Sequence, residues 1–125
     1  MNVPGFLARR FYVAGSLRNT ETGFQLQAQN PMGAGTLVGI GRLSVDGRQI
    51  PAEAVSAVRS GDPTPMHAKD VSPRAPIHVA VGDRVTLFIA DQTLAAGRHR
   101  LDVELIEVNI GRLRFSISDD LAVGA

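Results

Sequence analysis

The sequence of 125 residues contains no cysteine and no tryptophan, and its only lysine is Lys69. Without cysteine the chain has no disulfide, no thiolate zinc site and no cysteine nucleophile, which fits a reducing compartment. Positive charge therefore rests almost wholly on arginine, whose planar guanidinium group suits bidentate pairing with carboxylates or phosphates.

An excess of one charge and long hydrophobic runs are missing too. A formal net charge of +1 gives no long-range field to attract nucleic acid, and the few aromatic residues form no stacking platform. The N-terminal stretch MNVPGFLARRFYVAG has no long apolar core behind a basic region, so it resembles neither a secretory signal nor a membrane span. We therefore expect a cytoplasmic protein that binds neither nucleic acid nor membrane.

The composition, 44% hydrophobic and 20% charged, is typical of one ordinary globular domain, here residues 1–125. Residues 23–30 alternate clearly, with Phe24, Leu26 and Ala28 on one face and glutamines on the other, which predicts a half-buried antiparallel strand. Similar short segments recur every eight to twelve residues. They predict an all-β fold, an antiparallel β-sandwich of the immunoglobulin or fibronectin-III type with about seven to eight strands.

Further strands are predicted in the segments 10–17, 36–47, 77–91, 99–107 and 112–119. In the segment 36–47, Leu37 shares a face with Leu43 while Ile40 points to the other side, and Gly39 and Gly41 indicate a bulge or a close backbone approach.

Two segments are ambiguous. Residues 48–60 fit either a helical turn that starts at Pro51 or short strands around Ile50 and Val55. Residues 60–76 hold four of the seven prolines, which predicts a long exposed loop, or an edge segment ordered only by a partner.

The stretch LAAGRHRLDVELIE, residues 94–107, gathers a histidine and three acidic residues. Side chains alternate along a strand, so His99 falls on the apolar face, opposite Asp102 and Glu104. We expect the acidic row to pair across strands with Arg112 and Arg114 rather than to form a reaction centre.

The sequence contains few residue spacings that are typical of catalytic or metal-binding sites. The three histidines show no HxH or HxxxH spacing, although a site of two histidines and one carboxylate could still assemble in space. The glycine-rich segment 32–41 lacks the following helix that a phosphate loop needs, and no GxSxG elbow occurs. Two carboxylates that act as a glycosidase pair remain an open alternative, although no segment isolates a candidate pair.

The proline-rich loop supplies the candidate functional residues, because loops carry binding groups more often than strands do. Met66, His67, Lys69 and Asp70 could project into a partner's cleft, with a merely solvated loop as the alternative. We assign no catalytic residue, no metal ligand and no cofactor to this chain.

Three segments, GSLRNTETGFQLQAQ (15–29), VDGRQIPAEAV (45–55) and LAAGRHRLDVEL (94–105), together resemble the small β subunits of bacterial C-glycoside deglycosidases. The resemblance implies an accessory subunit in a hetero-oligomer. It also implies that a larger TIM-barrel α subunit holds a divalent metal and cleaves the carbon–carbon bond between a 3-oxo-sugar and an aromatic aglycone.

The N-terminal pattern is also similar to that of chains described as hydroxymethylglutaryl-CoA reductase, but the length and the lack of a nucleotide or CoA site argue against that activity. Two further hypotheses remain beside the accessory subunit. One is a self-associating or ligand-binding β-sandwich without catalytic activity of its own, and the other is an independent enzyme that uses His67 or His99.

Overall fold

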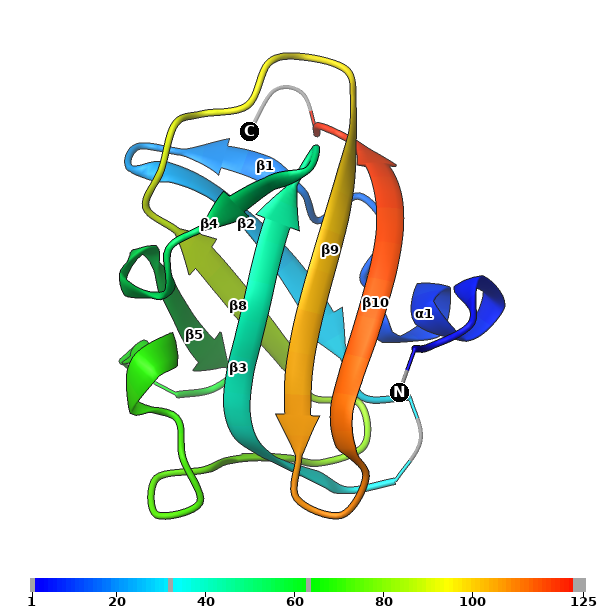
Figure 1. The fold of residues 1–125 in the computed structure, drawn as a ribbon, viewed down its shortest axis with the longest axis vertical. Helices are drawn as coiled ribbons and strands as arrows, with labels where there is room; N and C mark the ends of the chain where they lie inside the picture. The colour runs from blue at the N-terminus through cyan, green and yellow to red at the C-terminus, as the bar shows by residue number, and fades with distance from the viewer. Residues whose placement is uncertain (1, 32, 63, 123–125) are drawn as a thin grey trace.

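The protein folds as two antiparallel β-sheets packed face to face (Figure 1). The structure is a computed structural model that describes residues 2–31, 33–62 and 64–122. One sheet has the strand order β1-β2-β8-β5-β6, and the other has the order β10-β9-β3-β4, with β7 also paired to β3. The all-β sandwich predicted from the short alternating segments is confirmed.

The strands of the first sheet are β1 (Arg18–Thr20), β2 (Gly23–Gln29), β5 (Val55–Arg59), β6 (Met66–His67) and β8 (Arg84–Ile89). The strands of the second sheet are β3 (Gly35–Val45), β4 (Arg48–Ile50), β7 (Ile77–Val79), β9 (Arg98–Glu107) and β10 (Gly111–Asp120). The described helical elements are α1 (Gly5–Phe11) and two 3-10 turns, η1 (Ala52–Ala54) and η2 (Ala68–Asp70). Among the described residues, no helix is both long enough and apolar enough to cross a membrane.

Strand β2 shows how alternation builds the core. Phe24 and Leu26 are buried, while the intervening Gln25 and Gln27 are half-buried on the opposite face. Apolar residues at alternate positions of β8 and β5 are buried in the same way. The main core forms where the apolar faces of these strands meet the second sheet. The predicted half-buried strand at 23–30 is therefore confirmed.

Strand β3 is irregular at its glycines. Its pairing with β9 shifts register between Leu37 and Gly39 and again between Ile40 and Leu43, which confirms the predicted bulge. The prediction that Ile40 lies on the face opposite Leu37 is wrong, because the register shifts change the alternation and leave both side chains packed against the interior.

The strand predicted at 10–17 is wrong. Helix α1 runs through Phe11, and Tyr12 then makes only an isolated bridge to Ala28. Leu7 and Phe11 lie one helical turn apart, so both can turn toward the sheets. A helix of two turns is not stable alone, and packing against β10 and β2 holds it in place.

The two ambiguous segments are resolved. Residues 48–60 combine both alternatives: Ile50 ends β4, η1 follows Pro51, and Val55 starts β5. Within the segment 60–76, β6 pairs with β5 at the edge of the first sheet, and the following Ala68 and Val71 pack into the main core.

Candidate ligand-binding cavity

An apolar cavity of about 540 Å³ lies between the two sheets, on the side that α1 covers. The volume falls within the range of about 300–1,000 Å³ that small-molecule sites occupy. Its walls are the inward faces of both sheets: Leu26, Ala28, Val85 and Leu87 from the first, and Leu37, Ile40, Val103, Leu105 and Ile117 from the second.

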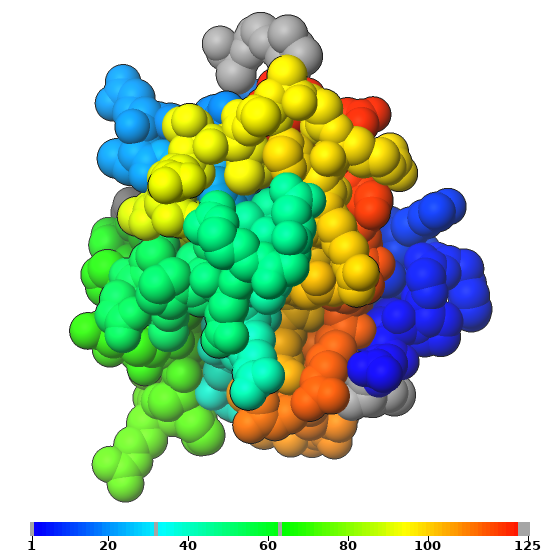
Figure 2. All heavy atoms as spheres, turned by 45° about the horizontal axis from the view of Figure 1, so that its top comes forward, coloured from blue at the N-terminus to red at the C-terminus, as the bar shows by residue number. Residues whose placement is uncertain are grey.

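Helix α1 forms the outer wall of the cavity. Leu7 and Phe11 line it together with Val3, whose backbone N–H donates to the carbonyl oxygen of Arg114 at 2.9 Å. The Phe11 ring packs on Phe115 of β10 with 5.3 Å between centroids and a tilt of 45°. Figure 2 shows the helix at the side of the molecule, next to β10.

The cavity lies where the two groups of core residues meet. The smaller group, under α1, comprises Ala8, Leu105, Leu113 and Phe115. Four apolar side chains touch both groups yet are only half-buried, because part of their surface faces the cavity: Leu37, Ile40, Val103 and Ile117. Protein interiors rarely leave voids larger than a water molecule, so this space is a candidate for a bound molecule.

One end of the cavity carries a carboxylate. Glu107, the last residue of β9, is buried and accepts backbone N–H bonds from Thr36 at 3.0 Å, Asn109 at 2.8 Å and Ile110 at 2.9 Å. Burial opposes its ionisation, but these backbone donors outweigh burial and hold the pKa of Glu107 below its ordinary value. The carboxylate therefore stays negative at neutral pH.

The phenol of Tyr12, in the chain that follows α1, is bound at the C-terminal end of β10. The Tyr12 hydroxyl donates to Asp119 Oδ2 at 2.6 Å, and the same oxygen accepts the Gly15 backbone N–H at 2.9 Å. Burial, and then the bond to Asp119, raise the pKa of Tyr12 above its ordinary value. Tyr12 is therefore a neutral donor that fixes the chain after α1.

Comparison with protein families matches residues 7–122 to the family described as the hydroxymethylglutaryl-CoA reductase N-terminal domain. The chain belongs to this family. The match covers both sheets and most of the residues around the cavity. No curated protein matches the chain.

The resemblance to C-glycoside deglycosidase β subunits is wrong, since the chain belongs to the reductase N-terminal domain family instead. The segments behind that resemblance consist of strands, among them the whole of β2, joined by glycine-containing turns. Gly15, Gly47 and Gly97 all adopt positive φ, between 79° and 117°. Glycine is common at turns in many β proteins because it adopts this conformation without strain. Similarity in such short segments therefore reflects shared turn geometry more than membership of a family.

The candidate loop residues lie away from the cavity. Met66 is half-buried against the main core on β6, whereas His67, Lys69 and Asp70 are exposed at the edge of the first sheet. None of the four lines the cavity. Their proposed role at a partner's cleft stays a prediction.

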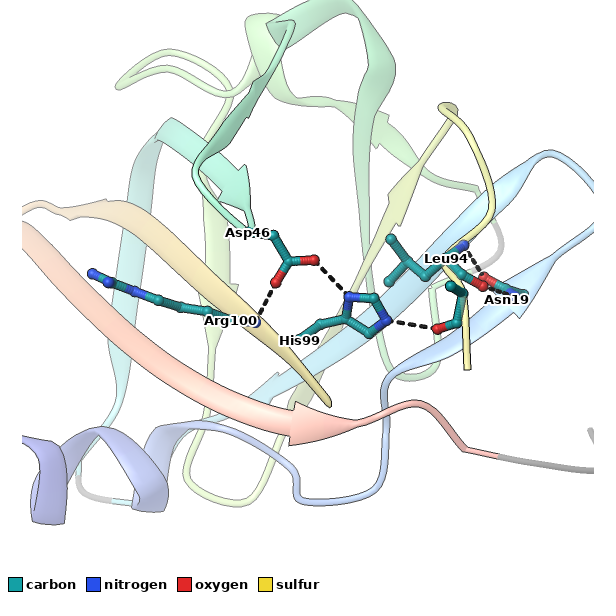
Figure 3. A network of polar contacts seen from close by, with 6 residues as sticks. Asn19, Asp46, Leu94, His99 and Arg100 are labelled. Carbon is teal, nitrogen blue, oxygen red and sulfur yellow. Dashed lines mark hydrogen bonds and ion pairs between the residues drawn. The ribbon is translucent and has the colours of Figure 1, made fainter. Parts of the chain in front are cut away.

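His99 takes part in a network that fixes the loop before β9 (Figure 3). Its Nδ1 lies 2.6 Å from Asp46 Oδ2, and its Nε2 lies 2.7 Å from the Ala95 carbonyl oxygen. Both nitrogens face acceptors, so the Asp46 carboxylate and then the Ala95 carbonyl raise the pKa of His99. Asn19 fixes the same loop by two bonds to the Leu94 backbone, at 2.8 and 2.9 Å.

The acidic row on β9 pairs largely as its position predicted. Glu104 binds Arg112 Nη1 at 2.9 Å and Arg114 Nε at 2.8 Å, which confirms the cross-strand pairs for this residue. Asp102 instead accepts from Ser116 at 2.8 Å and Arg100 at 3.3 Å. The row is a structural network on the outward face of its sheet.

The three histidines are spread over β6, β7 and β9. In the part of the chain that the structure describes, no three histidine or acidic side chains come together in a way that could hold a metal ion. The glycine-rich segment continues into β3.

The cavity itself was not predicted from the sequence. One signal was present: Leu7 and Phe11 have helical spacing in the segment before the first clear strand. That spacing is compatible with an amphipathic helix, but it does not reveal a space beneath one.

Proposed function

We propose that this domain is a ligand-binding β-sandwich, which holds an apolar molecule between its sheets and contributes binding rather than catalysis. The observation that carries the proposal is the cavity of about 540 Å³ with an almost wholly apolar lining. Pockets of this size with a few polar groups at their ends are typical of small-molecule sites.

Membership of the family supports an accessory role. In a reductase that contains such a domain, we propose that it binds a ligand beside the catalytic part. The TIM-barrel partner and its metal were implied by the deglycosidase resemblance alone and lose their support with it. The cytoplasmic location remains a proposal, supported by a composition without cysteine.

The test is binding of N-phenyl-1-naphthylamine, an uncharged probe whose fluorescence rises in apolar surroundings. We expect saturable binding to the full chain. Ala28→Phe would place a ring in the cavity and should weaken binding by at least about tenfold, which corresponds to about 1.4 kcal/mol.

The matched control is Gln25→Phe, on the same strand but with its side chain on the opposite face of the sheet. It should bind the probe as the unmodified chain does. Equal binding by both variants would show that the probe sits on the surface and would contradict the proposal.

A further inference from the structure

We propose that the cavity selects an uncharged amphiphile, with an apolar body and a neutral hydrogen-bonding end such as a hydroxyl, over the carboxylate of the same length. This inference rests on the proposed function and adds the chemical class of the ligand.

The first argument is the charge at the end of the cavity. Glu107 lines it, and three backbone N–H groups fix its carboxylate at 2.8–3.0 Å. These donors belong to the start of β3 and to the β9–β10 turn. The carboxylate therefore cannot move away without breaking its hydrogen bonds to both segments. A ligand hydroxyl can donate to a carboxylate, whereas a ligand carboxylate meets a like charge.

The second argument is the lack of a positive partner. The described residues that line the cavity include no arginine, lysine or histidine. Its other polar side chains are neutral: Tyr12, Gln29, Asn30 and Asn109. A charge taken out of water needs a partner, and an anionic ligand finds none here.

Two of the arginines that flank lining residues in the sequence are directed elsewhere. Arg112 and Arg114 alternate with the lining residues Leu113 and Phe115 and bind Glu104 on the outward face of the sheet. They hold that carboxylate rather than a ligand in the interior.

The experiment measures how 1-decanol and decanoate displace bound N-phenyl-1-naphthylamine, at about pH 8, where the carboxylate is ionised. We expect decanol to displace the probe at a concentration at least about tenfold lower than decanoate. Because an alcohol also enters any apolar phase more readily, the deciding quantity is the change of this ratio in variants.

Glu107→Gln removes the charge and should lower the ratio by at least about threefold. If that variant does not fold, the same ratio is measured for Asn109→Lys, which adds a cation at an exposed residue of the cavity lining. This variant should also lower the ratio. Ser118→Lys adds the same charge at an exposed position of β10 outside the lining and should leave the ratio unchanged.

An unchanged ratio in the folded charge variants, or equal displacement by both compounds in the unmodified chain, would overturn the inference while the cavity still binds the probe. If the probe does not bind at all, the proposed function itself fails.

Discussion

At the scale of single residues, the Glu104 carboxylate packs closely against the backbone of Gly41. A Cβ atom on Gly41 would lie only 2.1 Å from Glu104 Oε1, so the absence of a side chain leaves room for that carboxylate. The carboxylate is buried, and Arg114, together with the Arg42 backbone N–H and Arg112, holds the pKa of Glu104 below its ordinary value in spite of burial. One glycine thus makes space for an ion-pair network that joins three strands.

Gly41→Ala should therefore destabilise the fold. The new methyl group would displace a buried carboxylate from its donors, and we expect the free energy of unfolding to fall by about 1–3 kcal/mol, as for other disturbed buried networks. Gly35→Ala is the control on the same strand, because its nearest atoms lie 3.8–4.0 Å from an added Cβ. Denaturant unfolding measures both, and the control should stay within about 0.5 kcal/mol of the unmodified chain. Equal stability of the two variants would contradict this account of Gly41.

Much of this residue-level network could be predicted. Alternation placed Glu104 opposite the arginines of the next strand, and the glycines of β3 indicated the close approach. The role of Glu107 could not be predicted, since its three donors come from the backbone of Thr36, Asn109 and Ile110. Any sequence with an N–H at those positions would offer the same bonds.

At the scale of elements, the connection from β8 to β9 is fixed by contacts at both ends. Asp46 at φ 51° and Gly47 at φ 82° form the tight turn between β3 and β4, and this turn presents the Asp46 carboxylate to His99. The other Asp46 oxygen accepts the Arg100 backbone N–H at 2.8 Å. A turn in one hairpin therefore holds the start of another strand.

This contact predicts a pH dependence of stability. Because the pKa of His99 is raised, its protonated ring stabilises the fold fully below about pH 6.5, and this contribution is lost as pH rises through the folded-state pKa. The pKa of Asp46 is lowered, chiefly by His99, so its contribution is lost only as pH falls into the acidic range. The stability difference between the unmodified chain and His99→Gln should therefore shrink as pH rises above about 6.5.

Denaturant unfolding at a series of pH values gives this difference. His67→Gln is the control, since His67 is exposed on the edge strand β6. A His99 difference that stays constant with pH, or that grows as pH rises, would contradict the assignment of the charged ring.

The elements themselves were predictable to different degrees. Strands such as β2 and β10 follow from alternation alone, because one face of each is buried. Helix α1 was missed because its seven residues are too few for a clear period, and its stability comes from Phe115 and its neighbours rather than from its own sequence.

At the scale of the whole molecule, the cavity is a property of how the layers are spaced. Its lining combines the N-terminal helix with the inner faces of both sheets, over residues from Val3 to Ile117. Each apolar lining residue of the strands has the pattern of an ordinary core position in the sequence. The size of the cavity depends on the distance between two twisted sheets and on the helix that spans their open side, which no local pattern encodes.

The central claim is that an apolar molecule occupies this space, and methyl-resolved NMR of the chain with N-phenyl-1-naphthylamine tests it most directly. We predict nuclear Overhauser contacts from the probe to the methyl groups of Leu37, Val103 and Leu105, which line the cavity. Contacts confined to Val81 and Val108, which are 60% and 54% exposed, or no contacts at all, would contradict it.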